Sequence, residues 1–233
     1  MDSSIAAAFV LGSVAQVSLV LSGLFATWVT VPSRFVGWLA AFGAGALVSA
    51  VAFDLVAQGA ALGSVGVTLW MLIGAGVFIA GDYAVDRRIG SGGSEGGALG
   101  IVLGAAVDGV PESLIFGVSL ANGAGISTAF LAAVIISNIP QALAPSAELA
   151  AAGWSRSRLT IMWSVVVLTC GVAAALGFAV GALGGTGDRM AALAAGGVLC
   201  MLTNSLVPFA YEKGGRLAGL WTVVGFALAI LPQ

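Results

Sequence analysis

Apolar segments long enough to cross a lipid bilayer follow one another along almost the whole chain. Hydrophobic residues make up 60% of its 233 residues and charged residues only 8%. A soluble globular protein carries roughly 25% charged residues because its whole surface faces water, so the outer surface of this chain must face lipid. Since no polar stretch is long enough to bury a core of its own, the sequence predicts one all-α integral membrane domain over residues 1-233.

Polar clusters divide the chain into eight segments. A membrane-spanning helix needs about 20 predominantly apolar residues, and every segment except the short last one meets that length. The expected spans are residues 5-29, 35-60, 64-85, 97-121, 126-151, 158-182, 190-211 and 217-232. Only MDSS precedes the first span, without a basic stretch or an A-x-A site, so we expect this span to be retained and not cleaved as a signal.

Basic residues indicate the orientation of the bundle, because those in short loops remain on the cytoplasmic side. One set of alternate loops holds Arg34, Arg87, Arg88, Arg156, Arg158, Lys213 and Arg216. The opposite set holds only Arg189. We therefore expect a bacterial or archaeal inner (plasma) membrane protein with both termini outside the cytoplasm.

Three ionisable side chains are expected at bilayer depth, and all three are acidic: Asp54 in the second span, and Asp108 and Glu112 in the fourth. A charge buried in a membrane costs several kcal/mol, so such residues are functional candidates. Carboxylates without internal basic partners need a cation or a proton to neutralise them. Asp108 and Glu112 are four residues apart and share one helix face, which predicts a cation site.

Prolines accompany polar residues in two neighbouring spans. Pro111 lies between the two acids of the fourth span, and the fifth span carries Pro140 beside Ser137, Asn138 and Gln141. A proline inside a helix lacks an N–H and frees a carbonyl one turn earlier, and carriers build ion sites from such broken helices. We expect both spans to be broken at their prolines, with the two polar turns facing each other at about the same depth.

Further polar residues have two readings each. Ser137 is either part of the site or a helix-packing residue, Glu148 either lines an exit or reaches the headgroups, and Asn204 either touches the path or packs between helices. Charges at the ends of spans, beside basic residues, are expected to be solvated at the interface. These are Asp82, Asp86 and Glu212.

The two proline motifs resemble those of the ZIP family of metal transporters. The family's fourth span carries a pattern like H-N-x-P-E-G, and DGVPES matches it at residues 108-113. Its fifth span carries a pattern close to H-E-x-P-E-G, and SNIPQA matches it at residues 137-142. The second span, ending at Asp54, and SLVPFAYE at residues 205-212 also look like family motifs.

The resemblance implies eight spans, a homodimer, and a metal site between the fourth and fifth spans that carries divalent cations toward the cytoplasm. Position by position, it implies that Asp108, Glu112, Ser137 and Gln141 form one subsite. Asn138 would remain from a second subsite, whose other ligand is replaced by Gly109. The metal ion would be the transported substrate, with no tightly bound cofactor and no nucleic-acid partner.

Histidine is absent from the whole sequence, whereas the zinc sites of the ZIP family rely on imidazole. Oxygen ligands suit Mn, Mg, Ca or Fe(II) better than Zn or Cu, although zinc accepts carboxylates, and the sequence does not distinguish Zn, Mn, Fe and Mg. The alternative is a ZIP-fold protein that has lost metal transport and carries another small solute or acts as a sensor or assembly partner. An aspartyl protease using Asp54 and Asp108 is disfavoured because neither acid lies in a G-x-G-D motif, so no enzymatic activity is expected.

Overall fold

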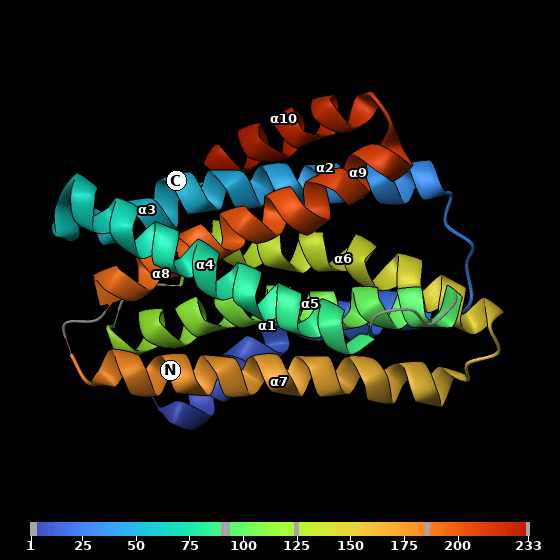
Figure 1. The fold of residues 1–233 in the computed structure, drawn as a ribbon, viewed down its shortest axis with the longest axis horizontal. Helices are drawn as coiled ribbons and strands as arrows, with labels where there is room; N and C mark the ends of the chain where they lie inside the picture. Colours follow the sequence, from blue (N-terminus) through green and yellow to red (C-terminus); the bar gives the residue numbers. More distant parts are fainter. Residues whose placement is uncertain (1–3, 90–93, 124–125, 185–186, 232–233) are drawn as a thin grey trace.

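The computed structural model describes residues 4–89, 94–123, 126–184 and 187–231, and within these ranges every regular element is a helix. In chain order the elements are α1 (Ile5–Phe25), α2 (Ser33–Ala50), the π-helical segment η1 (Val51–Leu55), α3 (Val56–Gln58), the 3-10 segment η2 (Gly59–Leu62), α4 (Gly63–Ile89), α5 (Ser94–Ala121), α6 (Thr128–Ala151), α7 (Arg156–Ala182), α8 (Gly187–Met201), the π-helical segment η3 (Leu202–Leu206), α9 (Val207–Gly214) and α10 (Leu217–Ile230). They form one elongated bundle (Figure 1).

Six helical stretches of the described residues are long and apolar enough to cross a membrane. They are Ile5–Phe25, Ser33–Ala84, Val102–Ala121, Thr128–Ala151, Arg156–Ala182 and Gly187–Gly214. The second stretch contains two of the expected spans, and the chain reverses within it at Gly63, whose φ of 69° suits glycine. Leu217–Ile230 is apolar but shorter. The structure agrees with an all-α membrane protein, and the count of eight spans stays a prediction.

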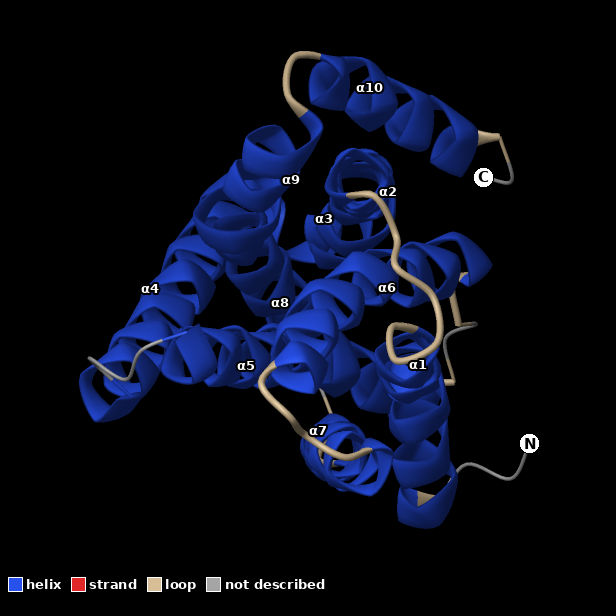
Figure 2. Cartoon of the chain, turned by 90° about the vertical axis from the view of Figure 1, so that its right-hand side faces the viewer, coloured by secondary structure: helices blue, strands red, loops and turns tan. Residues whose placement is uncertain are grey.

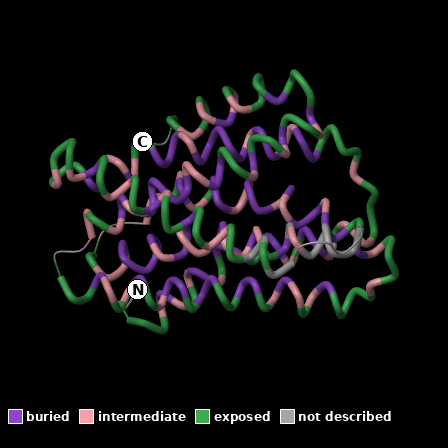
Figure 3. Tube along the Cα trace, in the orientation of Figure 1, coloured by how far each residue is buried: buried purple, intermediate pink, exposed green. Residues whose placement is uncertain are grey.

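Large apolar side chains cover the outside of the bundle. Leu72 and Val77 of α4 and Val165 and Leu176 of α7 are all more than half exposed. Exposed positions run along the outer sides of the peripheral helices (Figure 3). A surface of this kind is an aggregation hazard in water but suits contact with lipid tails, so the exposure pattern fits an integral membrane protein.

Basic residues gather at one end of the bundle (Figure 1). This basic end, as it is called below, comprises the helix ends and loops that hold Arg34, Arg87, Arg156, Arg158, Lys213 and Arg216. Arg189, in the first turn of α8, lies at the other end. Two contacts join neighbouring elements at the basic end: the Trp38 indole donates a hydrogen bond to the Gly214 carbonyl at 3.1 Å, and the Arg156 guanidinium lies 5.2 Å from the Trp28 ring centroid.

The expected breaks at Pro111 and Pro140 are absent. Pro111 lies inside α5, and Pro140 and Pro145 lie inside α6, and both helices continue through their prolines. A membrane helix accommodates proline when neighbouring helices hold it in place, so the prediction of proline-broken fourth and fifth spans is wrong for the described residues. Irregular backbone occurs instead in η1 and η3, two π-helical segments that the sequence did not suggest.

Glycines let α2 and α10 cross closely. A Cβ atom added to Gly45 would meet the carbonyl oxygen of Thr222, and one added to Gly225 would meet the carbonyl oxygen of Phe42. Small residues at such crossings allow helix backbones to touch where the surrounding lipid provides no hydrophobic drive for association. Each glycine thus contacts a carbonyl of the opposite helix, and that carbonyl belongs to the residue three positions before the opposite helix's own glycine.

The crossing of α4 and α8 has the same geometry. Gly74 lies on the carbonyl oxygen of Leu193, and Gly196 lies on the carbonyl oxygen of Met71. A constant separation of 151 residues relates the two crossings. The matching positions are 45 and 196, 74 and 225, 42 and 193, and 71 and 222. The two π-helical segments, 51–55 and 202–206, have the same separation.

The two related units are α2–α4 and α8–α10, and they run in opposite directions. Gly37 at the start of α2 lies against Gly214 at the end of α9, and Gly59 after α3 lies near Asp188 at the start of α8. The stretches α2–α3 and α8–α9 are therefore antiparallel, and the chain contains an inverted internal repeat. Seen from the basic end, α6 lies between α2 and α1, and α5 lies beside α8 and α7 (Figure 2). Helices α5 and α6, which carry most of the candidate site, lie outside both units, and α4, η3 and α9 contribute the remaining wall.

Candidate functional site

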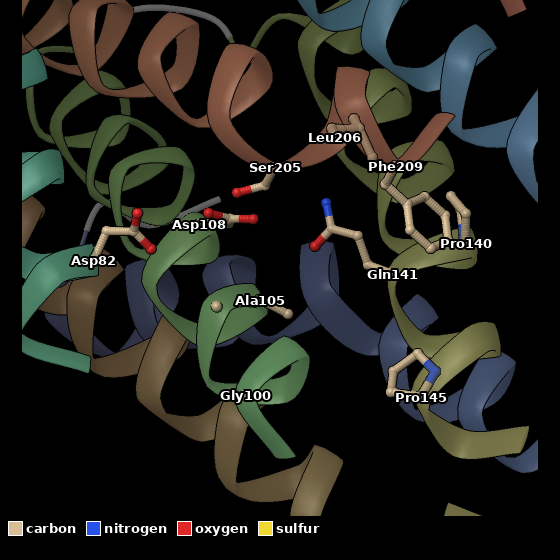
Figure 4. Close-up of a pocket in the computed structure, with 11 residues that line it drawn as sticks. Asp82, Gly100, Ala105, Asp108, Pro140, Gln141, Pro145, Ser205, Leu206 and Phe209 are labelled. Atoms are coloured by element: carbon tan, nitrogen blue, oxygen red, sulfur yellow. The ribbon is translucent and has the colours of Figure 1, made fainter. Parts of the chain in front are cut away.

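A cavity of about 390 Å³ lies between α4, α5, α6 and the segment formed by η3 and α9 (Figure 4). Its lining residues are Asp82, Gly100, Gly104, Ala105, Asp108, Pro140, Gln141, Pro145, Ser205, Leu206 and Phe209. The cavity runs from Asp108 along the earlier turns of α5 and the later turns of α6, and therefore toward the basic end. This space is called the ion cavity below.

Oxygen atoms from four elements line the ion cavity. Asp82 comes from α4, Asp108 from α5, Gln141 from α6 and Ser205 from η3. Figure 4 shows the Ser205 hydroxyl and the Gln141 amide directed toward the Asp108 carboxylate, with Asp82 on the opposite side of Asp108. Within the described part of the chain, no lysine or arginine lines this cavity. Two carboxylates, a hydroxyl and an amide therefore surround this space.

Two glycines of α5 provide the room beside Asp108. Gly100 and Gly104 precede it by two turns and one turn on the same helix face. A Cβ atom added at either position would meet no described atom within 4 Å. The missing side chains leave space free of described atoms on this face of α5, next to Asp108.

Glu112 lies one turn beyond Asp108 and is held by an amide chain that crosses three helices. The Gln16 side chain of α1 donates through Nε2 to Glu112 Oε2 at 3.2 Å. Its Oε1 accepts a hydrogen bond from Asn138 Nδ2 of α6 at 2.7 Å. All three side chains are buried, and none of them lines the ion cavity. The two acids of α5 therefore have different surroundings.

Each of these acids keeps one oxygen without a hydrogen-bond donor. Asp108 is 5% exposed and Glu112 is 1% exposed. Among the described residues, no hydrogen-bond partner meets Asp108 Oδ1 or Glu112 Oε1. A buried carboxylate oxygen without a donor is costly, and a bound cation is one means of satisfying it.

Ser137 belongs neither to the wall of the ion cavity nor to the amide chain. It is fully buried, its hydroxyl donates to the Val134 carbonyl at 3.0 Å, and its backbone lies where a Cβ on Gly43 of α2 would be. The structure therefore places it in the contact between α2 and α6. Of the five predicted metal ligands, Asp108 and Gln141 line the ion cavity, and Glu112 and Asn138 belong to the amide chain.

Asp54 lies at the end of the bundle opposite the basic end. It accepts a hydrogen bond from the Ser127 hydroxyl at 2.6 Å, and the same hydroxyl caps the first turn of α6. The buried rings of Phe116 and Phe130, with centroids 5.2 Å apart, lie between Asp54 and Glu112 along α5 and α6. Apolar packing thus separates Asp54 from the ion cavity.

Glu148 and Asn204 also lie outside the ion cavity. Glu148 is exposed and lines a second cavity of about 170 Å³ at the basic end, together with Lys213. Phe209 belongs to the walls of both cavities and stands between them. Asn204 is exposed, and its amide nitrogen lies 3.8 Å from the Cys200 sulfur.

Three residues of the site were not predicted from the sequence. Asp82 was expected at the interface but lies in the cavity wall, because α4 continues for seven residues beyond it to Ile89; the side chain of Asp86 lies outside the described part. Ser205 lies in the wall of the ion cavity, whereas the sequence suggested its neighbour Asn204 as a residue of the path. Gln16 gave one signal in the sequence, since it is an amide side chain in the middle of a largely apolar first span.

A comparison with models of known protein families finds no match for this chain, and neither does a comparison with curated protein sequences. The geometry of the ion cavity and of the amide chain therefore carries the functional interpretation.

Proposed function

We propose that this protein is a membrane carrier of divalent metal cations, with the ion cavity at Asp108 as the substrate site. One observation carries the proposal. Asp108 and Glu112 lie one turn apart, both are buried, and each keeps an oxygen that no described donor satisfies. Two adjacent buried carboxylates without basic partners favour a cation over an anion or a neutral solute.

The donor set favours a hard cation. Asp82, Asp108, Gln141 and Ser205 offer carboxylate, amide and hydroxyl oxygens around the ion cavity, and Glu112 Oε1 lies one turn farther along α5. Oxygen ligands of this kind suit Mn²⁺, Mg²⁺ and Ca²⁺. Zn²⁺ and Fe²⁺ remain substrates to be tested, since both accept carboxylates.

The inverted repeat supports a carrier mechanism. Many carriers consist of two inverted units with the substrate site between them, and rocking of one unit against the other exposes the site to each side in turn. In this structure the ion cavity extends from Asp108 toward the basic end, and Phe116 and Phe130 pack between the acids and the other end. With the basic end in the cytoplasm, this is an inward-facing state, and net transport runs toward the cytoplasm with both termini outside.

The likeness of residues 108-113 and 137-142 to ZIP motifs supports the same function, together with eight spans and a homodimer. The absence of histidine keeps one alternative in place, namely a ZIP-fold protein that has lost metal transport and carries another solute or acts as a sensor or assembly partner. A ligand that binds only the folded state must stabilise it. That alternative therefore predicts no thermal stabilisation by Mn²⁺, Mg²⁺, Ca²⁺, Fe²⁺ or Zn²⁺.

Uptake into proteoliposomes tests the proposal. Asp108→Asn and Glu112→Gln keep side-chain shape but remove a charge, and each is expected to reduce Mn²⁺ uptake at least about tenfold, equivalent to about 1.4 kcal/mol. Glu212→Gln is the matched control, because Glu212 is 71% exposed beside Lys213. If Asp108→Asn and Glu112→Gln transport every metal as well as the wild type does, the ion cavity is not the substrate site.

A further inference from the structure

Gln16 of α1 donates a hydrogen bond to Glu112 of α5. It is fully buried, and both ends of its amide are engaged: Nε2 donates to Glu112 and Oε1 accepts from Asn138. A carboxylate only accepts hydrogen bonds, so the nitrogen side of the amide must face Glu112. The Asn138 contact holds the amide in that orientation. The chain of donors from Asn138 through Gln16 to Glu112 therefore has a single direction.

The space on the α1 side of Glu112 is filled. A Cβ atom added at Gly109 would lie 3.5 Å from Gln16 Nε2 and only 2.6 Å from the Cys170 sulfur. Even a methyl group at position 109 would thus collide with the thiol. The amide of Gln16 and the thiol of Cys170 together occupy the side of α5 that faces α1 and α7, away from the ion cavity.

We propose that Gln16 is a positioning residue that limits the substrate site to one cation. Its N–H group donates a hydrogen bond to Glu112 Oε2 and brings no charge to the site. The amide also occupies the position beside Oε2 that a second cation would need. Only Glu112 Oε1 then stays available to a cation bound at Asp108. This inference rests on the proposed function, because it concerns the number of ions that the same site holds.

Gln16→Glu tests the inference, since it replaces the amide nitrogen by an oxygen. The side chain keeps its length and still accepts from Asn138, but it now presents a second carboxylate to Glu112. Like charges at this distance require a cation between them or a proton. We expect wild-type protein in lipid nanodiscs to bind one Mn²⁺ per chain in calorimetry at pH 7.5, and Gln16→Glu to bind two.

Gln58→Glu is the matched control, because Gln58 is exposed at the end of α3. The same chemical change there should leave one Mn²⁺ per chain. Gln16→Met provides a second variant of similar size that removes both hydrogen bonds and adds no charge. It should still bind one Mn²⁺, with an affinity at least threefold different from the wild type, because Glu112 Oε2 is released.

The outcomes separate this inference from the proposed function. Two Mn²⁺ per wild-type chain, or one per chain in Gln16→Glu with wild-type affinity, would overturn the role of Gln16 while leaving the carrier function intact. Failure of Mn²⁺, Mg²⁺, Ca²⁺, Fe²⁺ and Zn²⁺ to bind the wild type would instead refute the proposed function. Should Gln16→Glu fail to yield a monodisperse protein, an unchanged affinity in Gln16→Met would overturn the inference.

Discussion

Asp54 and Ser205 occupy equivalent positions in the two inverted units. Each is the fourth residue of its π-helical segment, and they are 151 residues apart, at positions 54 and 205. Their surroundings differ, because Ser205 lines the ion cavity, whereas Asp54 accepts a hydrogen bond from Ser127 at the end opposite the basic end. One repeat position therefore lines the ion cavity and its counterpart does not. This difference between equivalent positions is the asymmetry that an inward-facing carrier would have.

The first prediction compares Ser205 with its neighbour. Ser205→Ala removes an oxygen from the wall of the ion cavity and should weaken Mn²⁺ binding about three- to tenfold, in line with the loss of one modest polar contact. Asn204→Ala should have no effect on binding, because Asn204 is exposed beside Cys200. Titration calorimetry on the two purified variants decides. A larger effect for Asn204→Ala than for Ser205→Ala would contradict the placement of Ser205, and not Asn204, in the wall of the ion cavity.

A second prediction concerns the approach to Asp108. Gly104→Leu places a bulky side chain in the ion cavity, where a Cβ meets no described atom within 4 Å, so the fold should tolerate it while Mn²⁺ uptake falls at least about tenfold. Gly76→Leu is the matched control. Gly76 is an exposed position on α4 with equally open surroundings among the described residues, outside the cavity wall. Equal uptake by the two variants would show that substrate does not pass Gly104.

Phe209 yields a third prediction, because it stands in the walls of both cavities. Phe209→Ala should join spaces of about 390 and 170 Å³ and accelerate release of Mn²⁺ toward the basic end. Phe209→Trp should slow release. Exchange of radioactive Mn²⁺ from preloaded vesicles measures both effects. Phe53→Ala serves as control, since that ring packs against Phe226 outside both cavities, and identical exchange in all variants would exclude Phe209 as a barrier.

The fourth prediction tests the inverted repeat. Gly45→Ala and Gly196→Ala, at equivalent positions of the two crossings, each introduce a methyl group against a backbone carbonyl, of Thr222 and Met71 respectively. Overpacking of this kind costs roughly 1–3 kcal/mol, so both should lower the unfolding temperature by similar amounts. Gly219→Ala, where no described atom lies within 4 Å, should leave it unchanged or raise it slightly. Markedly different effects at positions 45 and 196 would contradict the equivalence of the two crossings.

The fold class and the two central acids could be predicted from the sequence because both follow from local chemistry. Few charges and long apolar runs require a lipid-facing helical bundle, and four-residue spacing places Asp108 and Glu112 on one helix face. It failed at Pro111 and Pro140, where the helices continue. A proline removes one hydrogen bond, but the packing of neighbouring helices decides whether the helix breaks.

Composition and spacing along the chain are enough to predict that the chain is helical, that its surface is apolar, and that its deep charges are acidic. The contacts of Gln16 with Glu112, of Asp82 with the cavity and of Ser137 with α2 emerge from the packing of the helices. Spacing along one helix establishes which side chains share a face. Which neighbour that face meets depends on how the helices cross, and here glycines distant in sequence set those crossings.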